Sequence, residues 1–177
     1  MSKEFLKYDL PVGWIWPKIE DLCLPTSGGT PSRRKLSYYN GDIPWVKSGE
    51  LNYNTILETE EHITAEALED SSAKLVPKNS LLIALYGATV GRLAYLGIEA
   101  ATNQAVAAIR TFASFPNRYL YYFLYHNKER ILRERVGGAQ PNISQAILNN
   151  INLPSARLLH QYLILLSQKI KLCHLLI

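Results

Sequence analysis

An unbroken run of six apolar residues, Leu81 to Tyr86, is the feature that most constrains the fold of this chain. The run has the length of a β-strand and shows no alternation of polar and apolar side chains, which is typical of a strand buried on both faces. Turn residues 87–91 follow it, and segments 92–96 and 105–110 predict two further strands. The sequence therefore predicts a sheet in which the strand at Leu81 is enclosed.

Helices are predicted on either side of these strands. Thr64 is a suitable N-cap for a short helix that runs to Ala73. Pro116 suits the first turn of a long helix, and Gly137 and Gly138 end it. Strands and helices thus occupy separate stretches of sequence, which indicates an α+β fold with a twisted, mostly antiparallel sheet and packed helices.

Several short elements are also indicated. Residues 40–42, Asn-Gly-Asp, predict a turn. Pro44 places the strand at 43–46 at a sheet edge or at its own first residues, because proline cannot donate to a ladder. Ser144 can cap another short helix, and residues 151–153 predict a brief strand.

The C-terminal residues 155–177 predict a final helix of the coiled-coil type, a spacer or dimerisation helix after a domain of residues 1–154. It carries too many polar residues for a membrane span. The helix must pack on its own domain or on another helix or subunit, and its apolar surface outside the seam favours the second. The seam positions, spaced three and four apart, are Ala156, Leu159, Leu163, Leu166, Ile170, Cys173 and Ile177.

Charge is distributed unevenly along the chain. The net charge is +4, with +7 on residues 101–177 and −4 on residues 51–100. A positive excess permits nucleic-acid binding without requiring it. The distribution fits a face for phosphates with an acidic region turned away from them, and it also fits ordinary surface charge on helices.

Catalytic and metal-binding motifs are missing from the sequence, so no catalytic residue and no metal site are predicted. There is no P-loop, no dinucleotide-binding glycine motif and no nucleophile elbow, and the four histidines are dispersed. Cys23 and Cys173 lack a metal-binding spacing, and both are expected to be reduced, as in a reducing cytoplasm. No signal peptide is expected at the N-terminus.

A nuclease or hydrolase is an alternative from another class. It would need carboxylates that converge on a metal beside a lysine, and Glu69, Asp70 and Lys74 are the available set. The ordinary role for these residues is a solvated helix end.

Residues suited to DNA recognition are concentrated in the predicted loops. Lysine and arginine contact phosphates, arginine reads guanine, and asparagine or glutamine reads adenine. Each residue also has an ordinary structural role, as a packed tyrosine ring or as an amide that satisfies the backbone. The candidates are Arg33, Arg34, Lys35, Tyr38, Lys47, Ser48, Asn52, Tyr53, Tyr86, Thr89, Arg92, Asn103, Gln104, Gln140 and Asn142. Among them, Lys47 and Arg92 are expected on phosphates, and Tyr53 or Gln104 on a base.

The order of several motifs resembles the target-recognition domain of type I restriction–modification specificity subunits. A predicted helix also follows Pro154, where that family places its spacer helix. The segments that carry the resemblance are Gly28–Ser32, Tyr39–Val46, Gly87–Arg92, Thr102–Ala105 and Gly137–Ser144.

This resemblance implies a non-catalytic module that reads double-stranded DNA. It implies modification subunits as partners, which methylate adenine with S-adenosylmethionine, and indirectly a restriction subunit driven by ATP. S-adenosylmethionine, ATP and Mg²⁺ are then expected only on those partners, and no cofactor on this chain. Members of the family usually carry two recognition domains. This chain has one, so it is expected to be a half-subunit that forms a homodimer through its C-terminal helix, or a truncated form.

The spacer helix departs from the family pattern. Pro154-Ser155 and His160-Gln161 stand where the family usually has Pro-Pro and Glu-Gln. The departure bears more on docking to modification subunits than on DNA binding. A further alternative is therefore a helix-mediated interaction protein that binds modification subunits without useful affinity for DNA.

Overall fold

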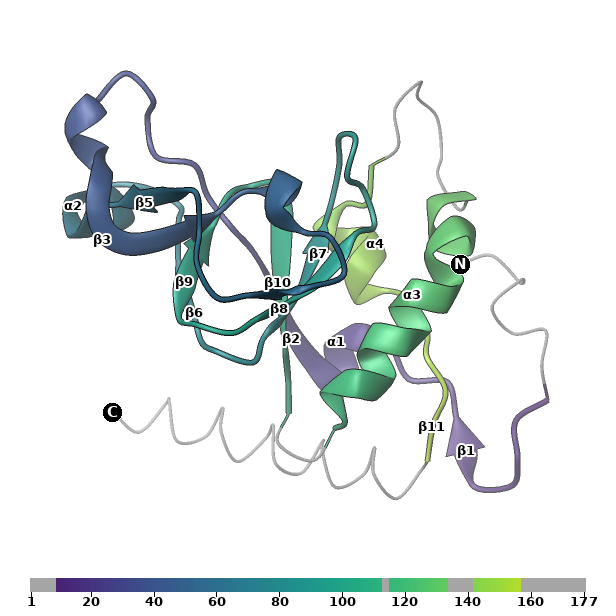
Figure 1. Cartoon of the computed structure of the whole chain (residues 1–177). Helices are drawn as coiled ribbons and strands as arrows, with labels where there is room; N and C mark the ends of the chain where they lie inside the picture. Colours follow the sequence, from purple (N-terminus) through teal and green to yellow (C-terminus); the bar gives the residue numbers. More distant parts are fainter. Residues whose placement is uncertain (1–8, 113–114, 134–141, 157–177) are drawn as a thin grey trace.

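The computed structural model describes residues 9–112, 115–133 and 142–156, and these residues form two mixed sheets, each with helical residues packed against it, and a two-stranded ribbon (Figure 1). The larger sheet has the strand order β2 (Cys23–Ser27), β10 (Val106–Thr111), β7 (Leu81–Ala84), β8 (Leu93–Leu96) and β4 (Thr55–Ile56). The smaller sheet has the order β5 (Glu61–Ile63), β3 (Tyr39–Val46), β9 (Ala100–Thr102) and β6 (Leu75–Val76). The α+β class is confirmed, with two larger sheets and a two-stranded ribbon in place of one sheet. The pairs β3–β9 and β4–β8 are parallel and the other pairs are antiparallel.

Strand β7 is enclosed on both faces, as its apolar run predicts. Leu81 and Ile83 pack into one hydrophobic cluster, together with residues of α1 (Ile19–Leu22), α3 (Asn117–Arg133) and α4 (Gln145–Asn149). Leu82 and Ala84 pack into a second cluster, with residues of the smaller sheet. Consecutive side chains of a strand point to opposite faces, so one short strand contributes to both clusters.

The two predicted helix caps are confirmed. The Thr64 hydroxyl accepts a hydrogen bond of 3.2 Å from the backbone N–H of Ala67, at the start of α2 (Ala65–Glu69). The Ser144 hydroxyl accepts one of 3.1 Å from Ile147 at the start of α4. Each cap satisfies an N–H group that has no partner within the helix. Helix α2 is shorter than the predicted segment, and the predicted end of α3 lies outside the described residues.

Strand β3 differs from its prediction. Residues 40–42 do not make a turn between elements but lie within β3, where the register against β5 shifts between Tyr39 and Ile43. Asn40 has a φ of 61° at this bulge, a conformation that asparagine tolerates. By strand order β3 is internal, and it begins at Tyr39 rather than beside Pro44, so both predicted places, a sheet edge and the first residues of the strand, are wrong. Pairing with β9 begins only at Trp45, so Pro44 has a neighbouring strand on one side alone.

The N-terminal arm pairs with the last described residues. Strand β1 (Trp14–Ile15) runs antiparallel to β11 (Ser155–Ala156) beside α3 (Figure 1). The predicted strand at 151–153 is reduced to a single bridge between Asn152 and Lys18. The helix predicted from Ser155 is therefore wrong at its first two residues, Ala156 of the seam included. Its other seam positions lie outside the described residues.

Candidate nucleic-acid interface

The predicted DNA-contact residues fall into three groups, apart from Gln140, which lies outside the described residues. The hairpin end lies around the β7–β8 connection and contains Tyr53, Tyr86, Thr89, Arg92 and Asn142. The middle loops contain Lys47, Ser48, Asn52, Asn103 and Gln104. The small-sheet end contains Arg33, Arg34, Lys35 and Tyr38.

At the hairpin end, segments far apart in sequence meet. Tyr86 forms a bridge with Asn142, which leads into α4. The backbone N–H of Tyr53 donates to the carbonyl of Leu93 over 2.7 Å, which holds the loop after the 3₁₀ turn Ser48–Glu50 against the start of β8. The Thr89 carbonyl accepts from the N–H of Arg92 and closes the hairpin turn. The structure thus brings five of the predicted residues to one end of the larger sheet.

Lys128 joins the hairpin end from α3. Its Nζ lies 3.2 Å from the hydroxyl of Tyr53. Its aliphatic stem crosses Gly91, where a Cβ would lie 3.0 to 3.3 Å from three of its carbons. Gly91 also has a φ of +74°, a region that side-chain-bearing residues rarely occupy. A glycine here therefore allows both the turn and the passage of the lysine.

Tyr53 occupies a costly conformation on the surface. Its φ is 60°, which is uncommon for a bulky residue, and the residue is 39% exposed. Its ring meets Tyr125 edge to face, with centroids 5.3 Å apart. Backbone, ring and hydroxyl are each held by a neighbour, so the side chain is positioned before any ligand arrives.

In the middle loops, the amide side chains serve local structure. The Oδ1 of Asn103 accepts a hydrogen bond of 3.1 Å from the N–H of Ala105 and shapes the β9–β10 turn. The Oε1 of Gln104 accepts from the hydroxyl of Thr30. Asn52 is exposed at a local turn in which its N–H donates to Asn54. Gln104 is exposed as well, so its NH₂ group faces solvent at the turn.

Lys47 is committed to carboxylates. Its Nζ lies 2.8 Å from Glu60 and 2.9 Å from Glu61, and its side chain is 29% exposed. Hydrogen bonds to Glu60 and then Glu61 raise the pKa of Lys47. A phosphate would have to compete with two carboxylates for this ammonium group, so its contacts argue against the predicted phosphate role.

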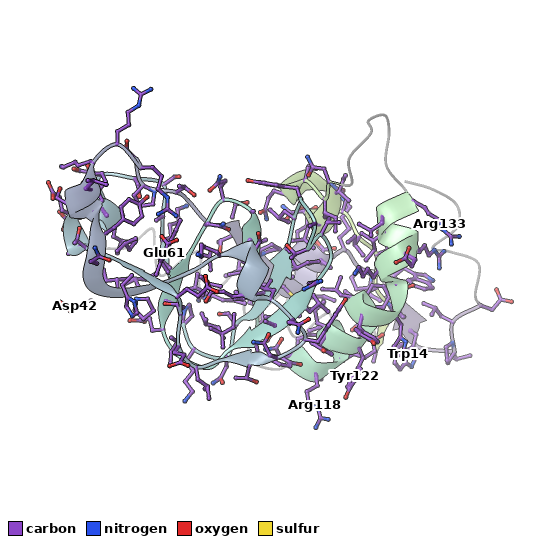
Figure 2. The ribbon with its side chains drawn as sticks, turned by 45° about the horizontal axis from the view of Figure 1, so that its top comes forward. Trp14, Asp42, Glu61, Arg118, Tyr122 and Arg133 are labelled. Atoms are coloured by element: carbon purple, nitrogen blue, oxygen red, sulfur yellow. The ribbon has the colours of Figure 1, made fainter. Side chains whose placement is uncertain are left out.

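Ion pairs also occupy the small-sheet end. Arg33 binds Glu61 over 2.6 Å, and its guanidinium lies 4.4 Å from the centre of the Tyr39 ring. Lys35 binds Glu66 over 2.6 Å. Among the described residues, Arg34 alone of the predicted cations at this end has no carboxylate partner. Figure 2 shows Glu61 at the smaller sheet, away from α3.

Asp70 is one of the carboxylates that the nuclease alternative would require. The Tyr38 hydroxyl donates to Asp70 over 2.6 Å, and the Tyr38 ring is buried. In the described part of the chain, no three His, Cys, Asp or Glu side chains are grouped so as to hold a metal. Asp70 therefore belongs to the ion-pair network of the small-sheet end.

The described residues show neither a reactive thiol nor a membrane helix. Cys23 is fully buried, and burial raises the pKa of its thiol to about 12, so it stays protonated and unreactive at neutral pH. Within the described ranges, no helix has the length and apolarity to cross a membrane.

Sequence reasoning missed the exposed tyrosines of α3. Tyr122 and Tyr125 are 49% and 47% exposed, and neither is among the predicted DNA-contact residues. The signal was available in the sequence, since tyrosines at 121, 122 and 125 cannot all face the stripe that buries Leu120 and Leu124.

Comparison with known proteins adds a family to this geometry. Residues 11–168 match the family model of the type I restriction modification DNA specificity domain. The specificity subunit of the type I restriction enzyme EcoR124I/EcoR124II of Escherichia coli is 28% identical over 145 residues, 78% of this chain and 36% of that protein. The MjaIX specificity subunit of Methanocaldococcus jannaschii is 30% identical over 159 residues, 85% of this chain and 37% of that protein.

Solved structures agree at the level of the fold. The HsdS subunit of Thermoanaerobacter tengcongensis superposes with a TM-score of 0.67 at 20% identity, over 93% of this chain and 40% of that one. A chain from a type I R-M system gives a TM-score of 0.69 at 20% identity, over 94% of this chain and 41% of that one. The chain spans about two fifths of the length of these relatives. The resemblance seen in the sequence is confirmed, since a family model that covers most of the residues places this chain in the type I restriction modification DNA specificity domain family.

Proposed function

We propose that this chain binds double-stranded DNA in a sequence-specific manner and contributes recognition, without catalysis, to a type I restriction–modification assembly. Its specificity-domain family supports this function. The observation that carries the proposal is that some cations are paired with carboxylates and others are not. Arg33, Lys35 and Lys47 are neutralised by carboxylates, whereas Arg92 and Lys128 have no carboxylate partner among the described residues.

The acidic segment of the chain sharpens this contrast. Glu60, Glu61 and Glu66 belong to the stretch of net charge −4, and they pair with cations from the first fifty residues. Arg92 and Lys128, which have no carboxylate partner among the described residues, both lie at the β7–β8 turn. The field that attracts a polyanion is strongest where like charges are not compensated, so DNA is expected at the hairpin end.

The proposed division of labour at the hairpin end follows from side-chain chemistry. Arg92 and Lys128 bind phosphates and set the register of the duplex. Asn142 stands beside them as an exposed group suited to a base edge, because an amide can both donate and accept. In the middle loops, Gln104 is a second candidate for a base contact.

The proposed partners are those implied by the family. Modification subunits would supply adenine methylation with S-adenosylmethionine, and a restriction subunit would use ATP and Mg²⁺, in the cytoplasm. A second copy of this chain is a further proposed partner, through the apolar seam predicted at residues 159–177. No cofactor is proposed on the described residues.

Selection of bound duplexes from a random DNA pool tests the proposal directly. The full chain is used alone and together with a modification subunit, and the recovered duplexes are sequenced. We expect enrichment of one sequence motif in at least the second arm. Recovered pools that stay random in both arms would show that the chain does not read sequence.

A further inference from the structure

A strip of tyrosine rings runs along α3 and continues onto neighbouring elements. Tyr121 stacks on Tyr95 of β8, with centroids 5.2 Å apart, and on Tyr125, with centroids 6.1 Å apart. Tyr125 contacts Tyr53, and Tyr122 meets Tyr121 edge to face over 5.4 Å. We refer to these five residues as the tyrosine strip.

Burial explains only part of the strip. Tyr95 and Tyr121 are half-buried against the first hydrophobic cluster. Tyr53, Tyr122 and Tyr125 are 39%, 49% and 47% exposed, and a core does not need their hydroxyls. Contiguous exposed aromatic surface marks a contact with a ligand more often than scattered exposed side chains do.

A cation stands beside a strip tyrosine at each end of the strip. Lys128 Nζ lies 3.2 Å from the hydroxyl of Tyr53 at one end. At the other end, Arg118 lies four residues before Tyr122 on the same helix, and both project from the first half of α3 (Figure 2). When a phenol oxygen accepts from a cation, its own proton remains to be donated. Each pair therefore offers a ligand a cation and a phenolic hydroxyl that can donate.

A cation with a hydroxyl donor beside it favours an anionic or strongly accepting partner. Helix α3 carries four Arg or Lys residues and one Glu, so its surface complements a polyanion. The strained backbone of Tyr53, with its φ of 60°, holds one pair in place before the ligand binds. A surface of protein carboxylates or of DNA phosphates would satisfy the donors, but only DNA presents anionic oxygens at regular intervals over the length of a helix.

We infer that the pairs Tyr53–Lys128 and Tyr122–Arg118 bind phosphodiester oxygens of DNA, and that the tyrosine strip is a backbone-binding surface beside the base-reading hairpin end. This inference rests on the proposed function and extends it to α3. Arg118, Tyr122 and Tyr125 then position the duplex and carry no sequence information.

Salt dependence of binding distinguishes phosphate contacts from other effects. The full chain, with Lys128→Gln and Arg118→Gln combined, is titrated with a labelled random-sequence duplex over a range of salt concentrations. Each lost phosphate contact lowers the slope of log K against log salt by about 0.9, so the double variant is expected to lose about 1.8. The motif recovered from a random pool should stay the same.

A matched control removes the same charge at the opposite end of β7. Lys78 and Arg110 are exposed and line one small hollow there, so Lys78→Gln with Arg110→Gln is expected to leave the slope unchanged. Tyr53→Phe keeps the ring contact with Tyr125 and removes only the hydroxyl, and it should weaken binding about tenfold. Circular dichroism spectra of all variants should match that of the parent chain.

The outcomes separate this inference from the proposed function. A parent chain that selects a motif, with an unchanged slope in the strip variant, would overturn the inference and leave the function standing. A strip variant that keeps its DNA affinity but no longer co-purifies with a modification subunit would assign the strip to that protein partner and would also overturn it. An equal loss of slope in the control variant would show that the effect comes from overall surface charge and not from the tyrosine strip, and would overturn the inference.

Discussion

Cations with the same formal charge differ in what they can still offer a ligand. Lys47 makes two ion pairs under 3 Å and lies half-buried between β3 and the loop before β5. Arg92 has no carboxylate partner in the described part of the chain and lies beside the hairpin turn. Their sequence contexts both suggested phosphate contacts, so the difference comes from the tertiary neighbours alone.

Arg92→Ala should therefore affect DNA binding more than Lys47→Ala. Removal of one phosphate contact lowers the salt slope by about 1 across all sequences, and this is expected for Arg92. Lys47→Ala should leave the slope in place and instead lower the free energy of unfolding by about 1 kcal/mol, through its lost ion pairs. Binding titrations and urea denaturation measure the two effects. If Lys47→Ala lowered the salt slope more than Arg92→Ala did, the DNA interface would lie at the middle loops instead.

Gly91 offers a second test at the residue scale. Alanine there must adopt a φ near +74° and crowd the stem of Lys128, so Gly91→Ala is expected to cost about 1 kcal/mol of stability. Gly49 is the control, because a Cβ there would meet nothing within 4 Å and its φ is not positive. Gly49→Ala should change the free energy of unfolding little. Equal effects of the two substitutions would contradict the account of the turn.

At the scale of elements, an ion-pair network joins the segment between β2 and β3, the residue after β3, β5 and α2. Glu61 accepts from Arg33 and lies beside Lys47, and Lys35 reaches Glu66 of α2. These contacts lower the pKa of Glu61, with the hydrogen bond from Arg33 as the first cause. The network thus ties the smaller sheet together by charge, and it should weaken in acid.

The sign of the pH effect follows from the lowered pKa. The stabilisation is fully present above the ordinary glutamate value of about 4.5, and it is lost as the pH falls through the lower pKa of the folded state. Glu61→Gln should therefore lower stability at about pH 6 by about 1 kcal/mol and flatten the further loss towards about pH 3. Urea denaturation at each pH measures this. Parallel pH curves for the variant and the parent would show that Glu61 does not carry the effect.

Local signals account for the elements that were predicted correctly. The apolar run of β7, the cap residues Thr64 and Ser144 and the start of α3 at Pro116 are readable from a few neighbouring residues. Pairings between distant segments are not. The parallel pair β3–β9 and the pairing of Ser155 with Ile15 depend on where the chain returns, and a strand of two residues has no periodicity of its own.

The same limit applies to the candidate interface. Motif order identified the family, and loop composition suggested which residue types bind DNA. The sequence could not show that Glu60 and Glu61 neutralise Lys47, or that Lys128 crosses the hairpin to reach Tyr53, because both depend on tertiary folding. The phosphate role predicted for Lys47 therefore stays a prediction, and the exposed tyrosines of α3 are not among the predicted contacts.

At the scale of the whole molecule, β7 couples two hydrophobic clusters. Ile83 lies in the cluster beneath α1, α3 and α4, and Leu82 lies in the cluster against the smaller sheet. The strand has no solvent face, so neither cluster can open without exposing apolar surface of the other. The residues of these two clusters should therefore unfold as one cooperative unit.

Substitutions on the two faces of β7 test this coupling. Leu82→Ala and Ile83→Ala should each lower the free energy of unfolding by about 2–5 kcal/mol, with a single transition in urea. Leu57→Ala, at a residue 68% exposed, should cost less than about 0.5 kcal/mol. Fluorescence and circular dichroism should report the same midpoint. Two separated transitions in either β7 variant would show that the clusters unfold independently.

The ribbon of β1 and β11 has an architectural consequence. Trp14 and Ala156 are cross-strand partners, so their Cα atoms lie within about 6 Å. The chain therefore enters and leaves this unit at neighbouring positions. Two such units in tandem, or one unit inserted into another protein, would each keep their hydrophobic core, because the connections join only at these two neighbouring positions. The pairing of the first and last strands is thus compatible with duplication of the unit and with its transfer into another protein.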